Sequence, residues 1–173
     1  LRQAKLQGRK RSAKLTGMRK VLCLVCLPLI GLEILLVNVI QTLSLALLPV
    51  SGAAFRAVNR NCARLWFSSL ALFLEYLPGL EIVQTGDVPP PKENAFVVAN
   101  HQSGADIPVI IVLAHRCRRC ADLKWFVKDV IKWVPGIGWG MLFLDCLFLK
   151  RNWTADKEKI LATFARLREH RVP

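Results

Sequence analysis

Apolar residues are concentrated in the first half of the chain. Residues 21–50 are almost unbroken apolar sequence, with Glu33 as the single charge. A helix needs about 20 apolar residues to cross a bilayer, so this stretch predicts one tilted span or two shorter helices around a break. Basic residues flank it on both sides, which is awkward for a single crossing. We therefore favour a re-entrant or interfacial helical hairpin; a cleaved signal peptide and buried core helices are the alternatives.

A second apolar patch, residues 65–77, is rich in aromatic side chains and too short to span comfortably. We expect Pro78-Gly79 to end it. Between the two apolar stretches, three arginines lie four residues apart and therefore on one helical face. We interpret them as a solvated or headgroup-facing stripe: Arg56, Arg60 and Arg64.

After residue 79 the pattern changes to short apolar runs separated by turns. Alternation and compact apolar runs predict strands, and the interleaved segments predict helices. The predicted class is therefore α/β, a sheet flanked by helices and preceded by the N-terminal membrane helices. Asp106 and Thr154 are the expected helix caps. We expect strands at 80–85, 95–99 (buried), 123–127 and the end of 142–149, and loops at 86–94 and 134–138.

Composition narrows the class of protein. The chain has 173 residues, 53% of them hydrophobic, and a formal net charge of +13. Such apolar content excludes a disordered chain, and six cysteines are too few over this length for a disulfide miniprotein. Eight basic residues and no acidic ones lie in positions 1–20. A nucleic-acid-binding tail has this pattern, but the adjoining apolar stretch favours a membrane protein that faces an anionic surface.

The chemistry of the chain centres on His101. It follows the run 95–99, and Asp106 lies five residues further on. A carboxylate that binds one ring nitrogen orients an imidazole and leaves the other nitrogen free as a base. Such a pair can deprotonate an alcohol that then attacks an acyl carbonyl. The alternative is a plain helix cap beside a loop histidine.

The cysteines offer a weaker candidate. Cys117 and Cys120 form a Cys-x-x-Cys pair beside His115, which is half of a zinc site at most, since structural zinc needs four ligands. We predict no metal site and no cofactor. Cys23 and Cys26 lie at the edge of the apolar stretch, where palmitoylation is an alternative to simple apolar packing.

Two sequence blocks carry a family resemblance. Asn100-His-Gln-Ser-Gly-Ala-Asp106 resembles the His-x4-Asp motif of the glycerolipid acyltransferases, the family that includes the lysophosphatidic acid acyltransferases. Lys128, Val134-Pro-Gly-Ile-Gly-Trp139 and Phe148-Leu-Lys-Arg-Asn-Trp153 look like the second block of its eukaryotic branch. The resemblance covers roughly residues 80–173, so we expect three parts: a basic tail (1–20), a membrane-associated helical region (21–79) and the N-terminal part of an acyltransferase domain (80–173).

The resemblance implies roles for the matched residues. His101 would be the general base on the free hydroxyl of a lysophospholipid, and Asp106 would orient it. Acyl-CoA would be the co-substrate and acyl donor. Arg151 would hold the phosphate of the acceptor, with Lys150 as a weaker candidate, because a guanidinium suits phosphate. The implied substrate-binding positions also include Asn100 and Ser103.

One departure from the family pattern limits this expectation. The third family block contains Glu-Gly, and no Glu-Gly occurs in the chain, which stops at about the place where that block should begin. We therefore expect a fragment with little or no activity by itself. The implied product is phosphatidic acid, made at the cytoplasmic face of the endoplasmic reticulum membrane. Lysophosphatidylinositol or lysocardiolipin are alternative acceptors, and a non-catalytic, membrane-binding fragment is the alternative class; nucleic acid is not an expected partner.

Overall fold

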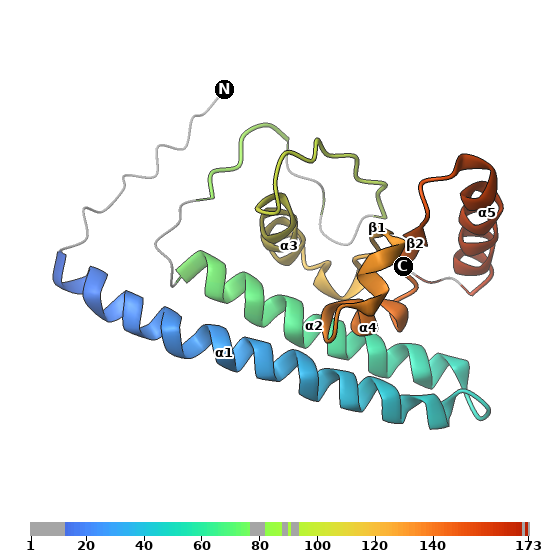
Figure 1. Cartoon of the computed structure of the whole chain (residues 1–173), viewed down its shortest axis with the longest axis horizontal. Helices are drawn as coiled ribbons and strands as arrows, with labels where there is room; N and C mark the ends of the chain where they lie inside the picture. The colour runs from blue at the N-terminus through green and yellow to red at the C-terminus, as the bar shows by residue number, and fades with distance from the viewer. Residues whose placement is uncertain (1–12, 77–81, 88–89, 91–93, 171, 173) are drawn as a thin grey trace.

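The computed structural model describes residues 13–76, 82–87, 90, 94–170 and 172, with side chains from residue 17 onward (Figure 1). Most of the basic tail, the Pro78-Gly79 helix end and the start of the strand predicted at 80–85 lie outside the described residues. Residues 82–85 are described and have no regular secondary structure, so a strand there is not observed.

The first half of the chain folds as a helical hairpin. Helix α1 (Ala13–Leu43) continues without a break through Pro28 and is extended by the short 3-10 helix η1 (Ser44–Leu47). Helix α2 (Gly52–Tyr76) then runs back beside it, so that the two long helices lie antiparallel (Figure 1). The turn lies at residues 48–51, at the end of the apolar stretch and not inside it.

Within the described residues, one helical segment is long and apolar enough to cross a membrane. It is Gly17–Leu47, with a mean hydropathy of 2.5 and only 11% of its most apolar part buried. Pro28 lacks the backbone N–H that would close one hydrogen bond of this helix, and the helix nevertheless continues through it. Large apolar side chains such as Leu24 and Leu27 are exposed along it.

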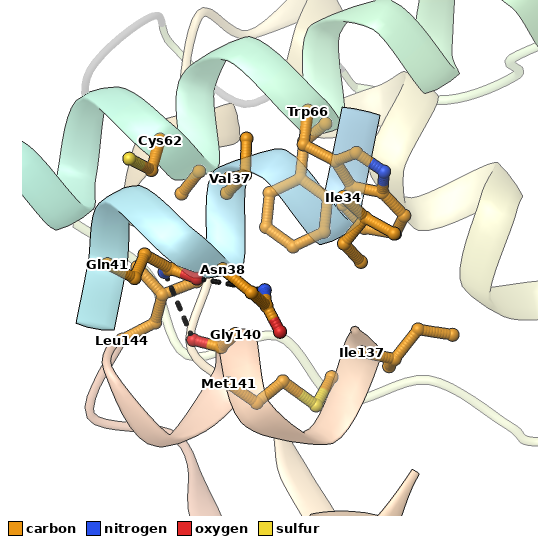
Figure 2. Close-up of a pocket in the computed structure, with 12 residues that line it drawn as sticks. Ile34, Val37, Asn38, Gln41, Cys62, Trp66, Ile137, Gly140, Met141 and Leu144 are labelled. Carbon is orange, nitrogen blue, oxygen red and sulfur yellow. Dashed lines mark hydrogen bonds between the residues drawn. The ribbon is translucent and has the colours of Figure 1, made fainter. Parts of the chain in front are cut away.

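The buried side of α1 is polar where it meets the rest of the protein. Asn38 Nδ2 donates to Gln41 Oε1 at 3.1 Å, and Gln41 Nε2 donates to the carbonyl of Gly140 at 3.4 Å. Gly140 belongs to helix α4 (Ile137–Leu142), which Figure 2 shows lying against this end of α1. A Cβ at position 140 would contact both amide side chains, so glycine allows the close approach of the two helices.

The core lies between α2 and helix α3 (Asp106–Arg116). α3 begins as predicted at the Asp106-Ile-Pro segment, because proline is tolerated in a first helical turn. Small residues on α2 leave room for β-branched residues of α3, so the two helices pack closely. The cluster is apolar: Ala63, Phe67, Ala71, Ile111, Val112, Ala114 and Cys120.

The described sheet is small. Strand β1 (Phe126–Lys128) pairs in parallel with strand β2 (Leu147–Leu149), with Phe126 opposite Leu147 and Lys128 opposite Leu149. The 3-10 helix η2 (Cys120–Asp122) precedes β1, and the 3-10 helix η3 (Asp129–Trp133) and α4 come between the two strands. Helix α5 (Trp153–Glu169) follows β2. The protein is therefore mainly helical with a two-stranded parallel sheet, a narrower sheet than the α/β prediction implied.

Three local predictions need correction. The buried strand expected at 95–99 is irregular and exposed, with Val98 83% accessible, because no described strand pairs with it and an unpaired strand is unstable. The loop predicted at 134–138 ends two residues early, as α4 starts at Ile137. The cap of α5 is Asn152, whose side chain accepts the N–H groups of Thr154 and Ala155.

Candidate active site

The turn before α3 brings His101 and Asp106 together. His101 Nδ1 lies 3.0 Å from Asp106 Oδ2, as the five-residue spacing predicted. Asp106 does not cap α3, however: Ala105 occupies the cap position, and Asp106 is the first helical residue. Its carboxylate instead turns back toward the preceding loop, and this orientation is what allows it to contact the imidazole.

Asp106 also organises the backbone of that loop. The same oxygen, Oδ2, accepts the N–H groups of Gln102 at 2.7 Å and Ser103 at 2.9 Å. The hydrogen bond from Ser103 contributes most to lowering the pKa of Asp106 below its ordinary value. The bond from Gln102 and the contact with His101 lower it further. The carboxylate is therefore ionised at neutral pH and can only accept hydrogen bonds.

The protonation of the imidazole follows from this. Since Asp106 can only accept, the proton on neutral His101 is assigned to Nδ1, and Nε2 keeps its lone pair. The His101 side chain is 70% exposed, so a substrate hydroxyl can reach Nε2. The turn thus presents an oriented base at the surface.

The other two predicted residues of this turn play different structural parts. Ser103 Oγ accepts the N–H of Ala105 at 3.1 Å, so its hydroxyl oxygen supports the turn. Asn100 is exposed, and the structure gives its side chain no hydrogen bond to any described residue. A substrate-binding role for either residue remains a prediction.

Lys150 and Arg151 immediately follow β2, at its carboxyl end. Arg151 has a φ of 62°, in the left-handed region that a residue with a side chain rarely adopts. Asp156 supports this conformation: its Oδ1 accepts the N–H of Lys150 and its Oδ2 accepts the N–H of Asn152, both at 3.1 Å. Asp156 is only 6% exposed. Sequence reasoning missed it; an acidic residue in the first turn of α5, five residues after Arg151, was the available signal.

Further cations lie around Asp129, just after β1. Lys132 Nζ forms an ion pair with Asp129 at 2.7 Å. The hydrogen bond from Lys132, and the charges of Lys150 and Lys159, lower the pKa of Asp129. Three lysines therefore lie near this acid where the two parallel strands end, the edge at which α/β proteins bind their ligands. Together with Arg151, the neighbour of Lys150 in the chain, they form a group that we call the basic edge, whose net positive charge suits a phosphate: Lys132, Lys150, Arg151 and Lys159.

The base and the basic edge are separate groups in the described structure, which gives no hydrogen bond or ion pair between them. Their connection is the segment that leads into His101. Phe96 packs edge-on against Phe126 of β1 at 5.8 Å between ring centroids, and Phe126 packs against Phe164 of α5 at 6.2 Å. These aromatic contacts attach the segment before the His101 turn to the sheet.

The cysteine pair lies in the interior of the protein. Cys117 and Cys120 are buried, and burial raises the pKa of Cys120 to about 11. Among the residues that the structure describes, no three His, Cys, Asp or Glu side chains are grouped so that they could hold a metal ion.

An accessible imidazole oriented by an ionised carboxylate is the arrangement of a general-base site. The model of the acyltransferase family matches residues 79–172, which include both the His101 turn and the basic edge. The chain belongs to this acyltransferase family.

Comparison with curated proteins narrows the kind of acyltransferase that the chain resembles. The chain is 31% identical over 140 residues to the 1-acyl-sn-glycerol-3-phosphate acyltransferase delta of Rattus norvegicus, and the match covers 79% of the chain. It is 31% identical over 140 residues (78% of the chain) to 1-acyl-sn-glycerol-3-phosphate acyltransferase 3 of Arabidopsis thaliana, and 32% identical over 144 residues (80%) to acyltransferase 2 of Brassica oleracea. In each case the match spans 37% of the relative's length. No solved structure matches the chain.

Proposed function

We propose that the protein transfers an acyl group from acyl-CoA to the free hydroxyl of 1-acylglycerol 3-phosphate, yielding phosphatidic acid. The observation that carries this proposal is the 3.0 Å contact between His101 Nδ1 and ionised Asp106, in a turn that leaves the imidazole accessible. The names of the relatives supply the substrate class. The proposed substrate is a precursor of phospholipids, so the proposed biological process is phospholipid biosynthesis.

The reaction needs one proton to move twice. His101 Nε2 removes the proton of the acceptor hydroxyl as its oxygen attacks the thioester carbonyl of acyl-CoA. Asp106 stabilises the resulting imidazolium. When the tetrahedral intermediate collapses, the carbon–sulfur bond breaks, and the coenzyme A thiolate takes the proton back from His101. No acyl-enzyme forms, so no nucleophilic side chain is required.

The basic edge binds the phosphate of the acceptor. Arg151 offers a planar fork of N–H donors and Lys150 a second charge, and Asp156 keeps their backbone in place. Orienting the phosphate would hold the acceptor hydroxyl near the base, and such positioning lowers the entropic part of the barrier.

The substrates explain a membrane location. Both the acceptor and the product carry long acyl chains, and the exposed apolar side of α1 would bury itself in the same bilayer. Arg19 and Lys20, near the start of the apolar segment, would lie at anionic headgroups. We place the protein at the cytoplasmic face of the endoplasmic reticulum membrane.

The test is an acyl-transfer assay with radiolabelled oleoyl-CoA on the full-length natural protein in membranes. Lysophosphatidic acid, lysophosphatidylinositol and lysocardiolipin are compared as acceptors, and we expect the first to be preferred. His101→Ala should reduce the rate by about 10²–10⁴-fold. The matched control is His115→Ala, outside the turn. Undiminished transfer by His101→Ala would refute the mechanism, and preference for another acceptor would refute the substrate assignment.

A further inference from the structure

Large apolar side chains are exposed along the segment from η3 to the end of α4. Six of them lie between residues 130 and 142, and Trp133 is the most accessible, at 72%. Exposed apolar surface that gathers in one segment marks a contact with a membrane or with another molecule. We call this group the η3–α4 patch: Val130, Trp133, Val134, Ile137, Trp139 and Leu142.

The patch adjoins the exposed apolar side of α1. A Cβ at Gly136 would lie 3.1 Å from Ile34 Cγ2. One at Gly140 would meet Asn38 and Gln41, so α4 rests on the second half of the apolar segment 17–47 (Figure 2). This same part of α1 carries further exposed apolar side chains: Leu35, Leu36, Val39, Ile40 and Leu43. The patch and α1 therefore present neighbouring apolar surfaces.

The chemistry of the patch fits the interface of a bilayer. Tryptophan is enriched at the level of the headgroups, because its ring is apolar while its indole N–H can still donate a hydrogen bond. Lys132 Nζ lies 5.4 Å from the centroid of the Trp133 ring and 2.7 Å from Asp129. A lysine can lay its aliphatic stem along apolar surface and keep its ammonium among headgroups. Lys150 and Lys159 add positive charge near Asp129, which suits anionic lipid.

A lipid surface accounts for these features better than a protein partner does. A protein that covered the patch alone would leave the adjoining exposed side of α1 in water, where only 11% of the most apolar part of that helix is buried within the described structure. A bilayer covers both surfaces together. It also needs no shape complementarity with the short, irregular η3–α4 segment.

We propose that the η3–α4 patch enters the headgroup region of the bilayer that holds α1, as a second membrane contact of the protein. The proposal rests on the membrane location given in the proposed function. Since η3 begins at Asp129, beside the basic edge, this contact brings the basic edge to the level of the headgroups. The phosphate of a lipid acceptor then reaches the basic edge without leaving the bilayer surface.

The test is photo-crosslinking of the full-length natural protein in vesicles of phosphatidylcholine and phosphatidylglycerol. The photoreactive residue p-benzoylphenylalanine is introduced singly at Trp133, Leu142, Leu36 or Leu161, and lipid and peptide adducts are counted by mass spectrometry. Leu36, on α1, is the reference for membrane contact. Leu161 is the matched control for Leu142, because the two are 58% and 55% exposed. Leu161 belongs to α5, which packs on β2 and stands apart from α1 (Figure 1).

We expect lipid adducts at Trp133 and Leu142 to exceed those at Leu161 by at least about fivefold, with circular dichroism showing folded proteins. Adducts at Leu36, with Trp133 and Leu142 no higher than Leu161, would keep the membrane location and overturn the second contact. Peptide adducts in place of lipid at Trp133 and Leu142 would also overturn it, since another part of the protein would then cover the patch.

Two further outcomes separate this inference from the proposed reaction. Absence of lipid adducts at every position, Leu36 included, would overturn the membrane location and the second contact together. Lipid adducts at Trp133 and Leu142 in a protein that transfers no acyl group would support the contact and count only against the proposed reaction.

Discussion

Asp156 accepts a hydrogen bond from the backbone N–H of Lys150 at 3.1 Å, and its other oxygen accepts one from Asn152 at the same distance. The arrangement resembles that of Asp106, which accepts two backbone N–H groups of the turn before α3. In both cases a carboxylate in the first turn of a helix shapes the loop that precedes it. The two loops carry the proposed base and the proposed phosphate ligands.

Replacing Asp156 should therefore affect substrate binding more than chemistry. Asp156→Ala leaves two N–H groups without partners, at a cost of about 1–3 kcal/mol each if they stay buried, and releases Arg151 from its left-handed conformation. We expect KM for lysophosphatidic acid to rise about tenfold with a smaller change in kcat. Steady-state kinetics measure this, with exposed Glu158→Ala in the same helix as the control. A fall in kcat at constant KM would contradict the positioning role.

The depressed pKa of Asp106 predicts a pH-dependent stability. Its carboxylate contributes stability that is present above its unfolded pKa, about 3.9, and is lost as pH falls through the lower folded value. Urea unfolding of the natural protein and Asp106→Asn should differ above about pH 5 and converge in strong acid. His101→Ala should keep most of this dependence, because the backbone bond from Ser103 lowers the pKa more than His101 does. Loss of the whole dependence in His101→Ala would show that the imidazole dominates.

Among the glycines that the structure describes, Gly138 is the least able to accept a side chain. A Cβ there would overlap the carbonyl oxygen of Ile131 and lie 2.9 Å from Lys132 Cα. Overpacking costs about 1–3 kcal/mol, and Gly138→Ala should reach the upper end because the contacts are with backbone. Gly140→Ala should be milder, since its contacts of 3.4 Å are with side chains. Gly31→Ala meets nothing within 4 Å and is the control. Thermal unfolding ranks the three, and an equal loss from Gly138→Ala and Gly31→Ala would contradict the ranking.

Cys120 and Cys146 should be unreactive in the folded protein. Burial raises both pKa values to about 11, so the thiols stay protonated at neutral pH. Their contribution to stability is present below the unfolded pKa, about 8.5, and falls as pH rises toward 11. Iodoacetamide labelling at pH 8, read by mass spectrometry with and without urea, should modify them only after unfolding. Rapid labelling of the folded protein would contradict this.

The spacing of residues predicted the contact between His101 and Asp106 better than it predicted the sheet. His101 and Asp106 are five residues apart across one turn, so local geometry determines whether they meet, and the sequence contains that geometry. Residues 95–99 have the composition of a buried strand, but a strand also needs a partner from elsewhere in the chain, and no local pattern supplies one. The sequence therefore indicated an apolar segment correctly and its secondary structure wrongly.

Two residues compete to cap α5, which explains why the predicted cap, Thr154, differs from the observed cap, Asn152. Thr154 and Asn152 are both good capping residues, and only the backbone conformation decides between them. The bonds from Lys150 and Asn152 to Asp156 set that conformation. Residue propensities could not predict these two hydrogen bonds, because in the sequence Asp156 looks like any acidic residue in a first helical turn. Pro28 was similarly ambiguous, as a proline within an apolar stretch fits a break or a continuous helix equally well.

The hydrogen bond from Gln41 to Gly140 also fixes how α1 is rotated about its own axis. A polyleucine helix of equal length would enter a bilayer as readily, but it would have no preferred side toward α4. The buried amides of Asn38 and Gln41 give α1 one side that must face protein, and thereby a defined side that stays exposed. If the proposed membrane location is correct, this exposed side would face the lipid, and the acyltransferase part of the chain would meet the membrane in one orientation.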